Sequence, residues 1–247
     1  MTTTSPDLWH HYGRTRAATG HDVPDTFCWT WSQDGGPGSE VLGDLTGLCV
    51  GDLGAGSARH AAHLATRRQP AQVVAIDSSA AQHARAIGLY GHLAPRLHLV
   101  HADVVDHLRI APDTYDVLYS VFGAIDFNDP RELLPAAAAA LRPGGRLVFS
   151  TLSHYLSGES AETDVVHADI PAKTPAGAPA TMRRWVLQEH VWTEVLDRAG
   201  LSDITIDLLP APSSGHRTAD TLLVTALRMK ARTLCHPLAR PTAARRV

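Results

Sequence analysis

A glycine-rich run carries the clearest chemical signal in the sequence. The run CVGDLGAGSAR extends from Cys49 to Arg59 and has glycines at positions 54 and 56. Glycine tolerates positive φ angles and lets a ligand approach the backbone closely, and a helix that begins directly afterwards presents oriented N–H groups. The run is typical of a nucleotide-binding turn, although a plain strand-to-helix turn has a similar composition.

Two acidic residues follow at the ends of the next apolar runs. Asp77 closes the run VVAID, about 20 residues further along, where a carboxylate can accept hydrogen bonds from ribose hydroxyls. Asp103 closes the run HAD, where it can accept from an adenine amino group or cap a short turn. Because the glycine turn and both acids fall at the same edge of a parallel sheet, they together predict a cofactor that contains adenosine.

From about residue 47 the chain alternates β-branched runs with Ala- and Leu-rich helical runs, which predicts βαβ units around a parallel sheet. We expect strands at Leu48–Leu53, Val73–Asp77, Leu97–His101, Val117–Val121, Arg146–Thr151, Ile204–Leu209 and Thr221–Leu227, and helices at Ser57–Arg68, Ala80–Tyr90, Arg131–Leu141 and Glu189–Ala199. The last two strands are joined only by a loop containing PAPSSG, so they should pair antiparallel near one edge. The expected fold class is α/β, a single doubly wound domain.

Three segments flank or interrupt this pattern. Residues 1–46 contain Trp9, Trp29 and Trp31, and we expect a helical cover or a lid over the site. Residues 152–184 are polar and rich in Gly, Pro and Ala, and are too long for an ordinary connection, which favours a substrate-binding loop or a disordered one. Residues 229–247 form a basic tail, so the cofactor domain is expected at 47–228.

The identity of the cofactor depends on the residue at the end of the glycine turn. A dinucleotide fingerprint, GxGxxG, requires a small residue at its sixth position, and Arg59 stands there. A nicotinamide dinucleotide is therefore disfavoured. The chain resembles instead the class I S-adenosylmethionine-dependent methyltransferases, whose first motif is an acid followed by GxGxG. That motif matches Asp52 to Ala58, with Ala58 in place of the last glycine.

The resemblance covers roughly residues 45–228. VLYSVF, which ends at Phe122, resembles the fourth strand of that family, and LRPGGRLV, which begins at Leu141, resembles its turn before the fifth strand. The resemblance implies a Rossmann-like, seven-stranded sheet with a reversed last strand, and S-adenosyl-L-methionine as cofactor. The cofactor contacts that it implies are Tyr12, Trp29, Asp52, Gly54, Ala55, Gly56, Asp77, Ser78, Gln82, Asp103, Val104, Ser120 and Phe122. Tyr12, Phe27 and Trp29 would contact the sulfonium and the substrate through their rings, or else fix the leader to the sheet by apolar packing.

The resemblance also narrows the substrate and the chemistry. Members that methylate nucleic-acid bases or glutamine carry (N/D)PP(Y/F) after the fourth strand. This chain has SVFG at residues 120–123, so that class of substrate is disfavoured. We expect no catalytic metal, because Asp126 and Asp129 have the sequence context of turn and cap residues and no third ligand accompanies His60 and His63.

A general base is needed only if the acceptor arrives protonated, and histidine suits that role because its pKa lies near neutrality. His154, directly after the fifth predicted strand, is the expected base or substrate contact, and otherwise a polar loop residue. His190 and His216 are weaker candidates because a helical stretch and a loop between edge strands hold them.

Composition restricts the partners. The net charge is −3, but residues 1–227 alone carry −9, which argues against a nucleic-acid groove. No run approaches the roughly 18 apolar residues of a membrane span, and neither a secretory leader nor paired cysteines are apparent, so we expect a cytoplasmic protein. Twenty of the 22 basic residues are arginine, which is typical of GC-rich coding, as in an actinobacterium.

Together these features predict methyl transfer to a small molecule, in specialised-metabolite biosynthesis. The sequence leaves two alternatives open, a cofactor-binding module without catalysis and a nicotinamide-dependent oxidoreductase. A homodimer is also compatible with the sequence.

Overall fold

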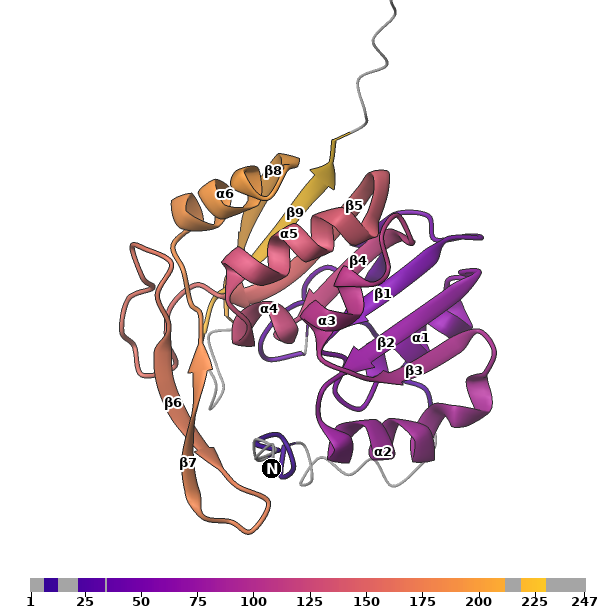
Figure 1. Ribbon diagram of the computed structural model, residues 1–247, viewed down its shortest axis with the longest axis horizontal. Coiled ribbons are helices and arrows are strands. Elements are labelled where there is room, and N and C mark those ends of the chain that lie inside the picture. Colours follow the sequence, from indigo (N-terminus) through magenta and orange to yellow (C-terminus); the bar gives the residue numbers. More distant parts are fainter. Residues whose placement is uncertain (1–6, 13–21, 34, 212–218, 230–247) are drawn as a thin grey trace, which may run out of the picture.

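The computed structural model describes residues 7–12, 22–33, 35–211 and 219–229, and its centre is a seven-stranded sheet. The strand order is β3-β2-β1-β4-β5-β9-β8 (Figure 1). The strands are β1 Cys49–Leu53, β2 Gln72–Asp77, β3 Leu97–His101, β4 Tyr115–Val121, β5 Leu141–Leu152, β8 Leu201–Leu209 and β9 Thr221–Arg228. β1 to β5 pair in parallel, whereas β9 pairs antiparallel with both β5 and β8. The predicted α/β class, with seven strands and one reversed strand, is confirmed.

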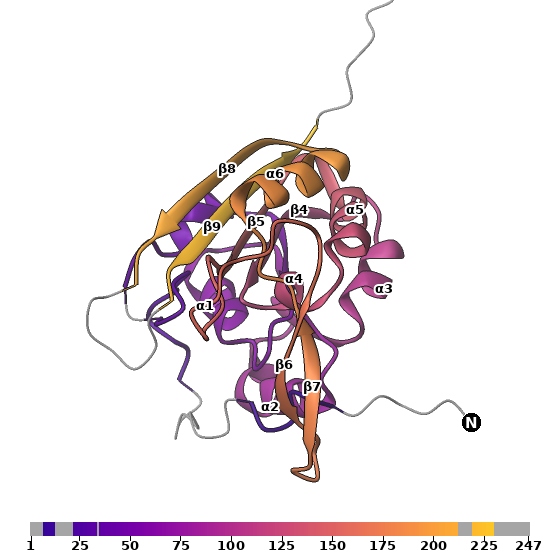
Figure 2. The same ribbon diagram turned by 90° about the vertical axis from the view of Figure 1, so that its left-hand side faces the viewer.

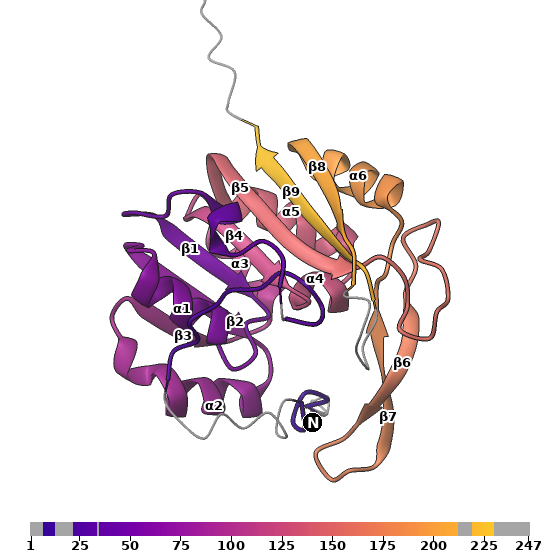
Figure 3. The same cartoon turned by 180° about the vertical axis from the view of Figure 1, so that it is seen from behind.

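Helices cover both faces of the sheet, because strand side chains alternate between the two faces. Figure 1 presents the face covered by α3, α5 and α6, and Figure 3 presents the face covered by α1 and the N-terminal segment. The helices are α1 Arg59–Arg67, α2 Ala80–Tyr90, α3 Val104–Arg109, α4 Ala124–Phe127, α5 Pro130–Ala140 and α6 Glu189–Arg198, with 3₁₀ turns η2 Ser39–Leu42 and η3 Gly91–Leu93. On β4, Leu118 packs into the hydrophobic core on one face of the sheet and Tyr119 into the core on the other face, so this strand contributes to both cores. No helix in the described ranges is long and apolar enough to cross a membrane.

The predicted helices occur close to their expected bounds, and capping residues mark the starts of two of them, α2 and α5. Ser79 accepts a hydrogen bond from the Gln82 N–H at the start of α2, and Asp129 accepts from the Arg131 N–H at the start of α5, which has proline at its first position. α3 and α4 were not expected, because a helix of four to six residues leaves too short an apolar period to detect.

The described part of residues 1–46 does not form the expected helical cover, and the role of the segment as a lid stays a prediction. The described parts of this segment contain a turn at 7–12 and the single-turn helix η2, and otherwise lie as irregular chain against the sheet. Leu42, Leu45 and Trp29 anchor that chain, each with at most 1% of its surface exposed. Apolar packing rather than helix formation therefore holds the described part of the segment after residue 22.

Residues 152–184, expected as a substrate-binding or a disordered loop, contain a β-hairpin, so they are not a loop without secondary structure, and their substrate-binding role stays a prediction. β6 (Ala168–Lys173) and β7 (Pro179–Arg184) pair antiparallel as a separate two-stranded sheet that projects from the body (Figure 2). The strands are rich in Ala and Pro, which have low β propensity, so the pattern gave no strand signal. At the hairpin tip, the His11 Nε2 lies 3.0 Å from the Thr174 carbonyl oxygen and 3.1 Å from that of Pro175.

Candidate functional site

A cavity of about 630 Å³ opens at the carboxyl ends of β1 to β4, where open α/β sheets bind ligands. Ten of the expected cofactor contacts line it: Tyr12, Gly54, Ala55, Gly56, Asp77, Ser78, Gln82, Asp103, Val104 and Phe122. The three remaining ones, Trp29, Asp52 and Ser120, lie behind its wall. The topology therefore brings together residues that are far apart in the sequence.

The glycine turn after β1 is held closely against the chain that leaves β4. Gly54 has φ +78°, and a Cβ there would lie 2.3 Å from the Ala124 nitrogen, so only glycine fits. Gly56 also has positive φ (+56°), but a Cβ there would meet nothing within 4 Å. The bare backbone at Gly56 faces open space, and this is the kind of surface that a bound cofactor requires.

Asp77 joins the end of β2 to this turn. Its carboxylate accepts hydrogen bonds from the Gly56 N–H at 2.7 Å and from the Ser79 N–H at 2.8 Å. Burial raises the pKa of Asp77, and these two hydrogen bonds oppose that effect. A carboxylate that is already oriented by two backbone donors can accept a third hydrogen bond from a ligand hydroxyl without moving.

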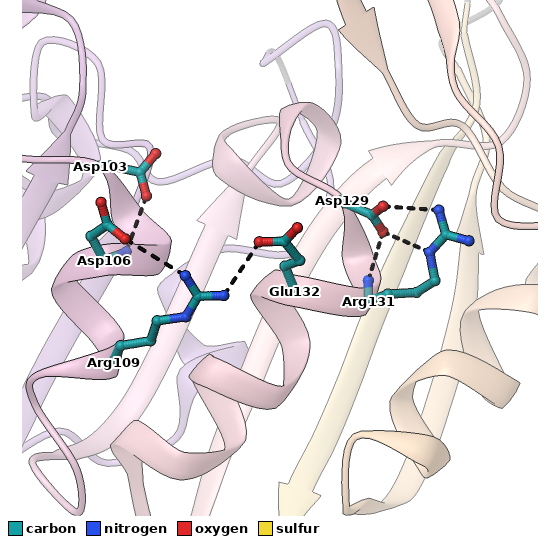
Figure 4. Close-up of polar contacts among 6 residues, drawn as sticks. All are labelled: Asp103, Asp106, Arg109, Asp129, Arg131 and Glu132. Atoms are coloured by element: carbon teal, nitrogen blue, oxygen red, sulfur yellow. Dashed lines mark hydrogen bonds and ion pairs between the residues drawn. The ribbon is translucent and has the colours of Figure 1, made fainter.

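Asp103 fits both of the expectations for it, because it lines the cavity and also caps a helix. Its Oδ1 accepts from the Asp106 N–H at 3.0 Å and so caps α3, while the residue also lines the cavity (Figure 4). Figure 4 also shows Arg109 between Asp106 and Glu132, with nitrogen to oxygen distances of 3.7 and 3.3 Å. Those side chains are more than half exposed, so the pairs contribute little stability.

Asp52, Ser120 and Trp29 support the cavity wall from behind, which corrects their expected place in the lining. Asp52 is 3% exposed and accepts a hydrogen bond from the Tyr119 hydroxyl at 2.8 Å. Burial raises the pKa of Asp52 to about 7, with the Tyr119 hydrogen bond lowering it and Asp77 raising it. Ser120 donates to the Leu53 carbonyl at 2.7 Å, and Trp29 Nε1 donates to the Gly38 carbonyl at 2.9 Å.

The comparisons with known proteins agree with this architecture. Residues 50–145 match the family model described as "Methyltransferase domain", which includes the glycine turn, both acids and the β4 exit. Residues 50–145 therefore match a methyltransferase domain, and the fold of the chain is that of the S-adenosylmethionine-dependent methyltransferases. The nicotinamide-dependent alternative is thereby set aside, and S-adenosylmethionine is the cofactor.

One curated relative and several solved structures are similar over most of the methyltransferase. A trans-aconitate 2-methyltransferase of Deinococcus radiodurans is 27% identical over 220 residues, which covers 82% of this chain and 71% of the relative. An S-adenosylmethionine-dependent methyltransferase from Mesorhizobium loti has 21% identity and a TM-score of 0.58, covering 76% of this chain and 94% of the other. A 1,6-didemethyltoxoflavin-N1-methyltransferase from Burkholderia thailandensis has 20% identity and a TM-score of 0.54, covering 75% and 72%. At these identities the solved structures support the fold.

The expected base, His154, does not line the cavity of the methyltransferase. Its Nδ1 lies 2.9 Å from the Tyr155 carbonyl oxygen, and the residue forms an isolated bridge with Ser160. His190 lies at the start of α6, also outside the cavity lining. His216 lies outside the described residues.

His60 lines the cavity, although its sequence context had indicated at most a metal ligand and not a base. Its ring packs on Phe27 with a centroid distance of 4.5 Å, and burial lowers its pKa to about 4. His63, which the sequence paired with it, points away and places Nδ1 2.9 Å from the Pro24 carbonyl oxygen. Among the described residues, no three His, Cys, Asp or Glu side chains gather as a metal site. The position of His60 directly after the glycine turn was the available signal.

The turn at residues 7–12 closes one side of the cavity by bonding to α2. Asp7 accepts hydrogen bonds from the Ser79 hydroxyl at 2.9 Å and the Ala81 N–H at 3.2 Å. The Gln82 side-chain amide donates to the carbonyl oxygens of Trp9 and Tyr12, each at 2.9 Å. Together with the contact of His11 on the hairpin tip, these bonds connect α2, the turn and the hairpin.

Proposed function

We propose that this methyltransferase transfers a methyl group to a small-molecule acceptor, in specialised-metabolite biosynthesis of a bacterium with a GC-rich genome. The observation that carries the proposal is that the glycine turn, the two acids and several aromatic side chains share one cavity of about 630 Å³. Small-molecule sites have volumes of about 300–1,000 Å³. The N-terminal turn and the hairpin flank this cavity, which favours a small acceptor over a polymer.

S-adenosylmethionine supplies a methyl group that the sulfonium already activates. The open backbone at Gly56 and the carboxylate of Asp77 suit the ligand's amino-acid and ribose portions, and Asp103 and Val104 suit its adenine. What the protein then contributes is alignment of the acceptor at about 3–3.5 Å from the methyl carbon and exclusion of water.

We assign the role first expected of His154 to His60. A pKa of about 4 keeps the imidazole neutral at pH 7, so it can accept a hydrogen bond from an acceptor hydroxyl or amine. No described residue donates to its ring, and its position in the lining leaves it available to a ligand. Alignment by such a bond suffices where the acceptor is already nucleophilic.

We further propose that the turn at residues 7–12 is the lid over the cofactor. Asp7→Ala removes the acceptor of two hydrogen bonds from α2, so the dissociation rate of S-adenosylhomocysteine should rise about tenfold, which corresponds to about 1.4 kcal/mol. Asp25→Ala is the matched control, because its ion pair with Arg67 is exposed and neither residue lines the cavity. Equal dissociation rates in the two variants would refute the lid.

The acceptor is tested by incubating the purified protein with S-adenosylmethionine and candidate acids, amines and phenols, and measuring a mass gain of one methyl group. Trans-aconitate is the first compound to try, because the curated relative carries that name. A product that requires both the protein and the cofactor supports the proposal. Cofactor binding without any methylated product across a broad extract of small metabolites would favour the module without catalysis. We also propose that the protein is cytoplasmic and has no nucleic-acid or membrane partner. We further propose that it forms a homodimer, which analytical sedimentation tests.

A further inference from the structure

A buried ion pair lies behind the aromatic wall of the cavity, where sequence context had indicated only a turn residue. The Arg184 Nη2 lies 2.6 Å from the Asp126 Oδ2, and the two side chains are 5% and 0% exposed. Asp126 is in α4, and Arg184 ends β7, 58 residues later. The Trp185 N–H also donates to the Asp126 carbonyl oxygen at 2.8 Å, so the base of the hairpin is fixed to α4 at two points.

The guanidinium of Arg184 also contacts two aromatic rings that line the cavity. Its Cζ lies 5.3 Å from the ring centroid of Trp31 and 5.3 Å from that of Phe127, distances at which a cation is attracted to a ring face. Trp31 belongs to the N-terminal segment and Phe127 to α4. One side chain from the hairpin therefore fixes the positions of two wall residues from separate parts of the chain.

Aromatic side chains are concentrated around this cavity. Trp9, Tyr12, Trp31, Phe122 and Phe127 line it, whereas the other aromatic residues of the chain do not. Trp31 packs edge-on against Phe122 at 5.0 Å, and Trp9 packs edge-on against Phe127 at 4.5 Å. Rigid flat walls of this kind favour a flat ligand, because they leave ring faces and edges for stacking.

The charges around the cavity argue against a cationic acceptor. The lining carboxylates are those of Asp77 and Asp103, both at the cofactor strands. Asp126 is screened from the cavity by its own ion pair with Arg184. The aromatic wall therefore presents ring faces, with a compensated cation behind them and no free carboxylate.

We propose that the acceptor of this methyltransferase is a planar aromatic compound, and that Arg184 is a positioning residue that holds Trp31 and Phe127 in place for it. This inference rests on the proposed function and names the substrate class of the same site. Arg184 acts through the rings it contacts, and Asp126 keeps its guanidinium in place between them.

The test uses saturation-transfer NMR on the full chain, with and without S-adenosylhomocysteine. The aromatic probes are phenol, indole and 4-hydroxybenzoate. The matched saturated probes are cyclohexanol and cyclohexanecarboxylate, and ethanolamine and trans-aconitate represent a cationic and a polyanionic acceptor. We expect at least one aromatic probe to bind, and its saturated or charged counterparts to bind at least fivefold more weakly, on the order of one stacking contact.

Variants then separate positioning from folding. Arg184→Lys keeps the positive charge beside Asp126 but removes the planar group between the rings, so aromatic affinity should fall about fivefold while S-adenosylhomocysteine affinity stays the same. Arg183→Lys is the matched control, because the neighbouring Arg183 is exposed. If Arg184→Lys unfolds, the pair Asp126→Leu with Arg184→Met removes both charges together and tests the same loss.

Equal binding of saturated and aromatic probes, binding of ethanolamine or trans-aconitate alone, or no aromatic binding would overturn the substrate class. Unchanged aromatic affinity in a folded Arg184 variant would overturn the positioning role. Failure of S-adenosylhomocysteine itself to bind would count against the proposed function instead, while the probe titrations without it still report on the wall.

Discussion

The Asp77 carboxylate accepts a hydrogen bond from the Gly56 backbone N–H at 2.7 Å, and this bond ties the end of β2 to the glycine turn that follows β1. The Asp77 side chain thereby joins the ends of two strands, at the place where we propose that the cofactor ribose binds. The side chain both shapes the turn and remains available to a ligand.

Replacing Asp77 should weaken cofactor binding more than it weakens the fold. In Asp77→Ala the turn loses its anchor and the ligand loses an acceptor, so the Kd for S-adenosylhomocysteine should rise at least about tenfold, or 1.4 kcal/mol. Calorimetry on the variant checks this. Asp207→Ala, an exposed carboxylate on β8, serves as control, and a Kd that rises equally in both variants would contradict the assignment.

Replacing Gly54 by alanine should lower the free energy of unfolding more than replacing Gly56 does. Gly54→Ala places a Cβ 2.3 Å from the Ala124 nitrogen at φ +78°, so unfolding free energy should fall by about 3 kcal/mol or more. Gly56→Ala meets no neighbour and should cost about 1 kcal/mol for its positive φ, yet it should impair cofactor binding. Urea unfolding compares the two, and similar losses would show that the close approach at Gly54 is not decisive.

Turnover measurements on two histidine variants should show which histidine contacts the acceptor. We expect His60→Ala to lower kcat about tenfold or more with the acceptor found in the mass-gain assay, and His154→Ala to leave it unchanged. Because burial lowers the pKa of His60 to about 4, its titration should not appear in the rate between pH 6 and 8. Loss of turnover in His154→Ala alone would restore the first expectation.

Asp52 should make the stability of the cofactor-free protein depend on pH. Burial raises its pKa from the ordinary 3.8 to about 7, so between those values the folded state binds more protons than the unfolded state. The Asp52 contribution to stability is therefore favourable at low pH, declines as pH rises through this window and levels off above pH 7. Relative to Asp52→Asn, the wild type should lose about 2 kcal/mol in unfolding free energy between pH 5 and 7.5. A constant difference between the two proteins would contradict the raised pKa of Asp52.

The sheet could be predicted because its signals are local. Val73 to Asp77 is a short β-branched run that ends in an acid, and Ser79 caps the helix that follows, so the pattern of residues gives both strand and helix. The glycine turn is equally local, since Gly54 and Gly56 lie within one loop. These features do not depend on what packs against them.

The rest of the site depends on contacts between distant residues. Arg184 and Asp126 are 58 positions apart, and nothing in AIDFNDP distinguishes a buried partner from a turn residue. The position of Trp29 could not be predicted either, because a tryptophan in the N-terminal segment fits a pocket wall or a core equally well. In the structure Trp29 is buried in the core. The hairpin escaped detection because its pairing, rather than its composition, makes it a sheet.

The most direct test of the central claim is a calorimetric titration of the full chain with S-adenosylhomocysteine, and separately with NADH. We predict saturable binding of S-adenosylhomocysteine with one site per chain, and no measurable heat from NADH. Binding of NADH in place of S-adenosylhomocysteine would contradict the account, because Asp77 and the glycine turn would then serve a dinucleotide.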